Sequence, residues 1–140
     1  SMILPEYLST RFLLPKSKIP SLKTWPKTFW VITACNPYSS GDRSNDDNNN
    51  KALRKDLVKL SSWIEPIICT SNDGGHDPEP SFAVNSLNHK QIQELAEKYH
   101  QNAVFLIEND RLKVVSCTEK KWQDAGNFLD KVQTHPLGDN

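Results

Sequence analysis

The residues best placed to do chemistry lie around Glu79, whose neighbours Pro78 and Pro80 hold the backbone extended on both sides. A carboxylate aimed in this way can act as a general base, ligate a metal or accept a hydrogen bond from a ligand amine. His76 lies three positions earlier and could assist Glu79 in proton transfer. The same carboxylate could instead accept hydrogen bonds from backbone N–H groups of its own loop, so both roles stay open.

A divalent metal between His76, Asp77 and Glu79 is chemically feasible, because imidazole and carboxylate groups are common metal ligands. We expect no metal there, since neither a helical nor a Cys-x-x-Cys spacing presents these ligands on one face. We also expect no tightly held cofactor, because the chain lacks the Gly-x-x-x-x-Gly-Lys-Ser/Thr and Gly-x-Gly-x-x-Gly sequences of the common phosphate-binding loops.

Several amide and hydroxyl side chains stand where the predicted strands and helices begin or end. Backbone N–H groups also point outward at such places, so the combination suits a small polar ligand. Each residue taken alone is more simply explained by a local role, because Asn and Ser favour helix caps and turns. The candidate ligand-binding residues are Thr33, Asn36, Asn50, Ser81, Gln101 and Asn102, and all but Asn102 are expected to share one cleft with Glu79.

The three cysteines, Cys35, Cys69 and Cys117, are expected to be reduced and mostly buried. Their odd number and wide spacing fit neither a disulfide framework nor a zinc motif. Cys35 and His76 could form a thiolate and base pair, but a cysteine directly after a buried strand is more often inert packing.

Hydrophobic patterns predict the elements that must position these residues. Asn88 and Gln91 have the spacing of a capping box at the start of a helix, and Asn109-Asp110 predicts a hairpin turn. The predicted strands are 28–34, 66–70, 81–84, 103–107 and 112–116. The predicted helices are one containing Leu53, Leu57, Leu60 and Ile64, one over 88–99, and a closing helix from Thr118 that buries Trp122, Ala125, Leu129 and Val132.

The order strand, helix, strand, strand, helix, strand predicts a split βαβ unit. We therefore expect an α/β (α+β) fold, a two-layer sandwich with a mixed sheet of five to six strands and helices mainly on one face. A chain of 140 residues fits a single domain. In this domain 28–117 is the core unit, 1–27 wraps around it with a short helix near Pro5 to Thr10, and 118–140 is a closing helix and tail. The Asn/Asp-rich segment 39–50 is expected to be a mobile loop.

Four short motifs follow one another along the chain: Val31 to Pro37, Asn50 ahead of Leu57, Glu79 to Val84, and Gln101 to Phe105. Together they resemble the domain-of-unknown-function 3293 family over residues 28 to 116. The resemblance implies a small bacterial cytoplasmic protein of unassigned activity, with these polar positions as its signature, and it implies no substrate. Two features depart from the family pattern, since Cys35 stands where a bulky aromatic side chain is common and the segment before Asn50 is unusually polar.

Seventeen basic residues balance seventeen acidic ones, so the chain has no long-range field that would gather nucleic acid or an anionic membrane. No apolar run approaches the roughly 20 residues that cross a bilayer, and the N-terminus lacks a signal-peptide pattern. We expect a cytoplasmic protein with neither nucleic acid nor membrane as a partner, and a monomer or weak homodimer.

Three functions remain open at this point. The leading hypothesis is binding of a small polar or nucleotide-like molecule at a cleft around Glu79. One alternative is a small hydrolase or transferase with Glu79 as general base and His76 assisting, and another is a protein-interaction module whose segment 39–50 orders on meeting a partner. An enzyme should place Glu79 in a pocket near His76, whereas an interaction module should expose an apolar patch.

Overall fold

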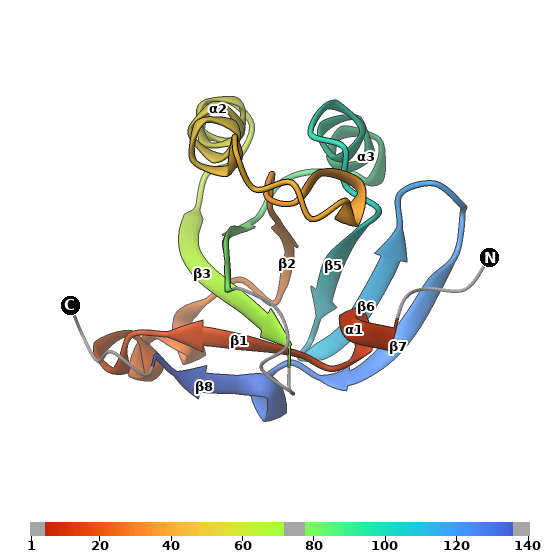
Figure 1. Ribbon diagram of the computed structural model, residues 1–140. Helices are drawn as coiled ribbons and strands as arrows, with labels where there is room; N and C mark the ends of the chain where they lie inside the picture. Colours follow the sequence, from red (N-terminus) through yellow and green to blue (C-terminus); the bar gives the residue numbers. More distant parts are fainter. Residues whose placement is uncertain (1–4, 72–77, 136–140) are drawn as a thin grey trace.

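The computed structural model describes residues 5–71 and 78–135, and its framework within them is one mixed sheet of eight strands (Figure 1). The strands are β1 (Thr10–Leu14), β2 (Thr28–Ile32), β3 (Ile64–Ser71), β4 (Glu79–Val84), β5 (Ala103–Glu108), β6 (Arg111–Ser116), β7 (Trp122–Asn127) and β8 (Val132–Thr134). The α-helices are α1 (Pro5–Leu8), α2 (Asp46–Val58) and α3 (His89–Lys98), and the 3₁₀ helices are η1 (Lys16–Thr24), η2 (Pro37–Ser39) and η3 (Leu129–Lys131).

The strands lie in the order β7-β6-β5-β2-β4-β3-β1-β8. Strand β4 lies between β2 and β3 and runs antiparallel to both, so β2 and β3 are parallel strands joined through α2. In the same way β2 separates β4 from β5, which are joined through α3. The centre of the sheet therefore consists of two interlocked split βαβ units, which confirms the predicted topology.

Helices α2 and α3 lie side by side on one face of the sheet (Figure 1). Two carboxylates in the first turn of α2, Asp46 and Asp47, favour the positive end of its dipole. The predicted capping box of α3 is confirmed, because Asn88 and Gln91 exchange two hydrogen bonds of 2.9 Å. Both helices are therefore fixed at the end nearest their preceding strand.

The sheet has a hydrophobic core on each face, because successive residues of a strand point to opposite sides. In β2, Trp30 and Ile32 belong to the outer core beneath α2 and α3. Phe29 and Val31 belong to the inner core, on the side where the sheet curls. Each face of β2 is thus buried, as the uninterrupted apolar sequence of that strand indicated.

The sheet must curl, because β7 and β8 form its two edges yet follow one another in the sequence. The chain from Asn127 to Val132 reaches at most roughly 18 Å. Eight strands laid flat would span roughly 34 Å. The expectation of five to six strands in a two-layer sandwich is therefore corrected to eight strands, with β1 and the edge strand β8 folding back around the inner core.

The predicted closing helix is wrong, because Trp122–Asn127 forms strand β7 on the edge of β6. Gly126 has a φ of +88°, which lies outside the α-helical region, and the strand is irregular at this level. Trp122 and Leu129, which the helix would bury, are 59% and 55% exposed. The apolar residues of this segment have the spacing of a helix by coincidence. The segment instead forms a strand that pairs with the edge of β6.

Two further expectations change near the N-terminus and in the Asn/Asp-rich segment. The short helix is confirmed as α1, but Thr10–Leu14 does not wrap around the core, because it is strand β1 and pairs with β3 and β8. Residues 46–50 are not loop, because they form the beginning of α2. The predicted hairpin is confirmed, and Asn109 and Asp110 adopt φ of +48° and +71°, as a two-residue type I′ turn requires.

Candidate functional site

A pocket of about 80 Å³ opens where β2 ends and where β4 and β5 begin. Helix α1, strands β1 and β3 and the residues that follow β2 complete its wall. The predicted site residues that line it are Thr33, Asn36, Glu79, Ser81 and Gln101. The structure therefore brings five of the predicted polar residues to one cavity, while Asn50 and Asn102 lie just outside its lining and His76 lies outside the described residues.

The segment after β2 is held against the start of β4 by side-chain hydrogen bonds to the carbonyl of Pro80. Thr33 Oγ1 donates to this carbonyl at 2.7 Å and accepts from the N–H of Cys35 at 3.1 Å. Asn50 Nδ2 donates to the same carbonyl at 2.9 Å, and its Oδ1 accepts from the N–H of Ala34 at 2.9 Å. Asn50 was expected to begin a helix, but it lies inside α2 and ties that helix to two strand ends.

Gln101 and Ser81 form the most deeply buried polar part of the wall, with 8% and 2% exposure. Gln101 Nε2 donates to the backbone carbonyls of Cys35 at 2.9 Å and Tyr99 at 3.0 Å. Ser81 Oγ donates to the backbone carbonyl of Glu79 at 3.0 Å. Both side chains are therefore fixed in place by the backbone around them.

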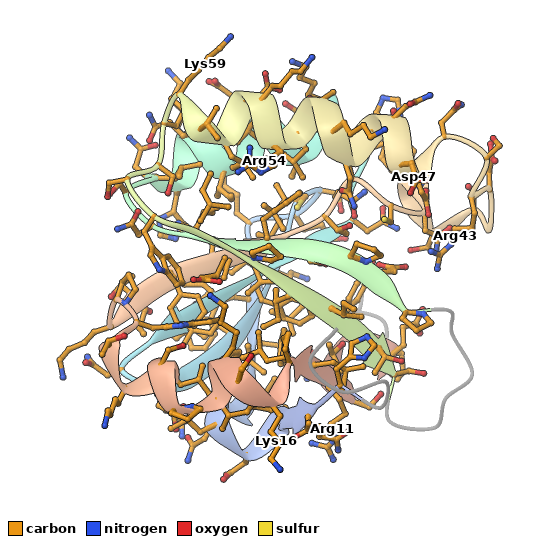
Figure 2. All side chains as sticks on the ribbon, turned by 90° about the vertical axis from the view of Figure 1, so that its left-hand side faces the viewer. Arg11, Lys16, Arg43, Asp47, Arg54 and Lys59 are labelled. Carbon is orange, nitrogen blue, oxygen red and sulfur yellow. The ribbon has the colours of Figure 1, made fainter. Side chains whose placement is uncertain are left out.

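Glu79 takes part in a charged network at the rim. Arg43 donates to Glu79 Oε2 at 3.0 Å and to Asp46 Oδ2 at 3.1 Å, and Asp46 Oδ1 accepts from the N–H of Asn36 at 2.9 Å. Figure 2 shows Arg43 beside the N-terminal end of α2. Sequence reasoning missed Arg43, although it is the one basic residue in segment 39–50 and so could have been sought as a partner for a carboxylate.

Helix α1 contributes the wall residues Glu6 and Tyr7, which sequence reasoning also missed. The Tyr7 hydroxyl lies 3.3 Å from Ser39 Oγ, and Asn102 Nδ2 donates to the same oxygen at 3.1 Å. Burial raises the pKa of Tyr7, so this side chain is a neutral phenol at physiological pH. Nothing in the sequence places α1 beside this pocket, because its position depends on the pairing of β1 with β3.

The thiols in the wall are protonated. Burial raises the pKa of Cys35 to about 11 and that of Cys69 to about 12. A reactive cysteine requires the opposite shift, because the thiolate is the nucleophile. All three cysteines are free, and Cys35 Sγ lies 3.7 Å from the carbonyl of Pro80 as a donor. The raised pKa of Cys35 favours the packing role, and its proposed partner His76 lies outside the described residues.

Comparison with known families identifies the chain. The family model described as "Protein of unknown function (DUF3293)" matches residues 32–104, more than half of the sequence. The chain belongs to this family. No curated protein and no solved structure matches it.

In this DUF3293 protein the matched stretch contains every candidate residue proposed from the sequence, whereas Glu6 and Tyr7 precede it. The family thus accounts for one side of the pocket, and the N-terminal elements supply the other. Of the metal ligands considered above, His76 and Asp77 fall outside the described residues. Within 5–71 and 78–135, no helix combines the length and apolar character needed to cross a membrane.

Proposed function

We propose that this protein binds a small polar molecule in the pocket beside Glu79. The observation that supports this function is the convergence of polar side chains from separate elements on one cavity, with buried Ser81 and Gln101 among them. Both side chains donate to backbone carbonyls, so their remaining lone pairs are what they can offer a ligand.

The size of the cavity limits the ligand. Its volume of about 80 Å³ is well below the roughly 300–1,000 Å³ of pockets that enclose drug-sized ligands. A nucleotide would extend mostly outside it. The pocket therefore suits a small polar molecule, or one polar end group of a larger one.

Binding is favoured over the two alternatives by the surroundings of Glu79 and of segment 39–50. One carboxylate oxygen of Glu79 is bound to Arg43, which stabilises the charged form of this carboxylate. A general-base role has less support in such a setting than an electrostatic one. Segment 39–50 is held by the Arg43 bridges and by the bond from the N–H of Gly41 to Asn36 Oδ1, which argues against a partner-induced ordering.

The test is a screen of small polar compounds by two-dimensional NMR on the ¹⁵N-labelled chain. We expect at least one compound to shift the amide resonances of Ser81 and Gln101, and we expect Ser81→Leu to abolish these shifts because the larger side chain fills the cavity. Ser62→Leu is the control, since Ser62 is exposed on another part of the molecule. Thermal melting verifies that both variants fold.

The proposal is overturned if no compound in the screen shifts the resonances of the pocket wall. It is equally overturned if the shifts persist unchanged in a folded Ser81→Leu variant, because the binding site would then lie elsewhere.

A further inference from the structure

The hydroxyl and amide hydrogens of four polar side chains in the pocket wall are already bound to backbone carbonyls. Ser81 donates its hydroxyl hydrogen at 3.0 Å, Thr33 at 2.7 Å and Thr10 at 3.0 Å. Gln101 donates to two carbonyls, at 2.9 and 3.0 Å, which uses both hydrogens of its amide. These four side chains can offer only lone pairs to a further partner.

The carbonyl oxygen of the Gln101 side chain is one of these acceptors. Gln101 is 8% exposed, and its Oε1 makes no hydrogen bond within residues 5–71 and 78–135. No fully buried side-chain nitrogen or oxygen in that part of the chain lacks a partner, so Oε1 keeps some accessible surface, and Gln101 is a residue of the pocket lining. It is therefore an acceptor presented to whatever enters.

The charged side chains of the described lining are negative, so they favour the same positively polarised ligand groups as these lone pairs. Two carboxylates, Glu6 and Glu79, line the pocket, whereas the described lining contains no lysine, arginine or histidine. Arg43 approaches Glu79 from outside the lining and shares its charge with Asp46. An anion in this pocket would meet carboxylates and lone pairs, at an electrostatic cost that a cavity of low dielectric increases.

Tyr7 and Ser39, which also line the pocket, provide a donor. Tyr7 and Ser39 share one hydrogen bond of 3.3 Å, and Ser39 also accepts from Asn102. Two hydroxyl hydrogens are present and one of them forms the bond between the pair, so the other can be donated to a ligand oxygen.

We infer that the pocket takes a small molecule bearing a protonated amine, with the ammonium group against Glu79, Ser81 and Gln101 and a hydroxyl group near Tyr7 and Ser39. This inference rests on the proposed function and specifies the chemical class of its ligand. An ammonium group carries three hydrogen-bond donors and no acceptor, which complements a wall of lone pairs and carboxylates.

Three probes of nearly equal size and different charge test the inference. They are ethanolamine, which is protonated at neutral pH, ethylene glycol, which is neutral, and glycolate, which is an anion. We expect ethanolamine to shift the Ser81 and Gln101 resonances at concentrations where glycolate leaves them unchanged, with ethylene glycol weaker than ethanolamine.

The variant Glu79→Gln removes the charge and keeps the size of the side chain. It should weaken ethanolamine binding by about tenfold to a hundredfold, as expected for the loss of a charge-assisted bond. Glu94→Gln, at an exposed position on α3, should leave the affinity unchanged. Should Glu79→Gln fail to fold, Glu6→Gln gives the same test from the opposite wall.

Tighter binding of glycolate than of ethanolamine would overturn the ammonium assignment and leave the pocket as a binding site. An ethanolamine affinity that is equal in the wild-type chain and in folded Glu79→Gln would overturn it as well. If all three probes leave the wall unchanged, the assignment is wrong, and the screen described above then decides separately whether the pocket binds any polar molecule.

Discussion

Asn50 connects three segments of the chain through one side-chain amide. It extends from α2, accepts a hydrogen bond from Ala34 after β2 and donates one to Pro80 in β4. Its polar character is thus explained by the structure it holds together, whereas Ser81 and Gln101 face the cavity. Asn50 therefore has a structural role, but not the capping role that the sequence suggested, because it lies inside α2 and its bonds reach distant segments.

We predict that Asn50→Asp lowers the free energy of unfolding by about 1–3 kcal/mol. The carboxylate keeps the acceptor for Ala34 but loses the donor for the Pro80 carbonyl and places negative charge against that oxygen. Urea denaturation measures the difference. Asn49→Asp is the matched control, because it adds the same charge one position earlier on α2, where the side chain is half-buried.

Equal unfolding free energies for Asn50→Asp and Asn49→Asp would contradict this role. The loss would then come from added negative charge in α2 and not from the bonds of Asn50.

The candidate residues that could be predicted from the sequence share one property. Thr33, Glu79, Ser81 and Gln101 lie close to strand ends that the split βαβ topology brings to one edge, so a correct topology was sufficient to group them. Arg43 and Tyr7 could not be found in this way. Their positions depend on a salt bridge across 36 residues and on a helix placed by strand β1.

At the scale of elements, β7 shows why apolar spacing alone is a weak guide near the end of a chain. Its backbone bonds are made with β6, and its residues are mostly exposed, so the sequence carries little hydrophobic signal for a strand. The central strands and α3 were predictable because each buries apolar side chains against neighbouring elements. That burial leaves a clear hydrophobic pattern in the sequence. Strands β1, β7 and β8 were not, because these short strands at or beside the sheet edges depend on pairing with distant residues.

We predict that Gly126→Ala destabilises the protein by roughly 1–2 kcal/mol, because a residue with a side chain is strained at a φ of +88°. A Cβ at this position would meet no atom within 4 Å, so the cost is conformational and not steric. In a helix the same substitution would stabilise the chain by about 1 kcal/mol. The sign of the change in urea midpoint therefore distinguishes strand from helix.

Gly126→Asn serves as the comparison, since asparagine tolerates the left-handed region better than alanine. Its loss should be smaller than that of Gly126→Ala. An alanine variant more stable than the wild-type chain would exclude the β7 conformation described here.

At the scale of the whole molecule, the two edges of the sheet are joined through Phe128. Its ring packs against Phe12, Trp25 and Phe29 at centroid distances of 5.1–6.2 Å, and the residue is 3% exposed. The inner core therefore extends from the first strand to the last turn. The inner core is therefore complete only when the sheet is curled.

We predict that Phe128→Ala lowers the free energy of unfolding by about 3–5 kcal/mol, the usual cost of removing a buried aromatic ring. Leu129→Ala, at the next position, should be nearly neutral because Leu129 is 55% exposed. Urea denaturation of the two variants measures both values. Similar losses for the two would show that Phe128 does not close the inner core.

The parallel pairing of β1 with β8 joins Phe12 to Val132, so residues from opposite ends of the described chain become neighbours. Loop-closure entropy slows the formation of such long-range contacts, and local pairs such as the β5–β6 hairpin form sooner. Strand β1 also carries Thr10 and positions α1, which completes the pocket wall. We therefore expect the pocket to be complete only after β1 has paired with β3, and a ligand that contacts Tyr7 to bind only chains that have reached that step.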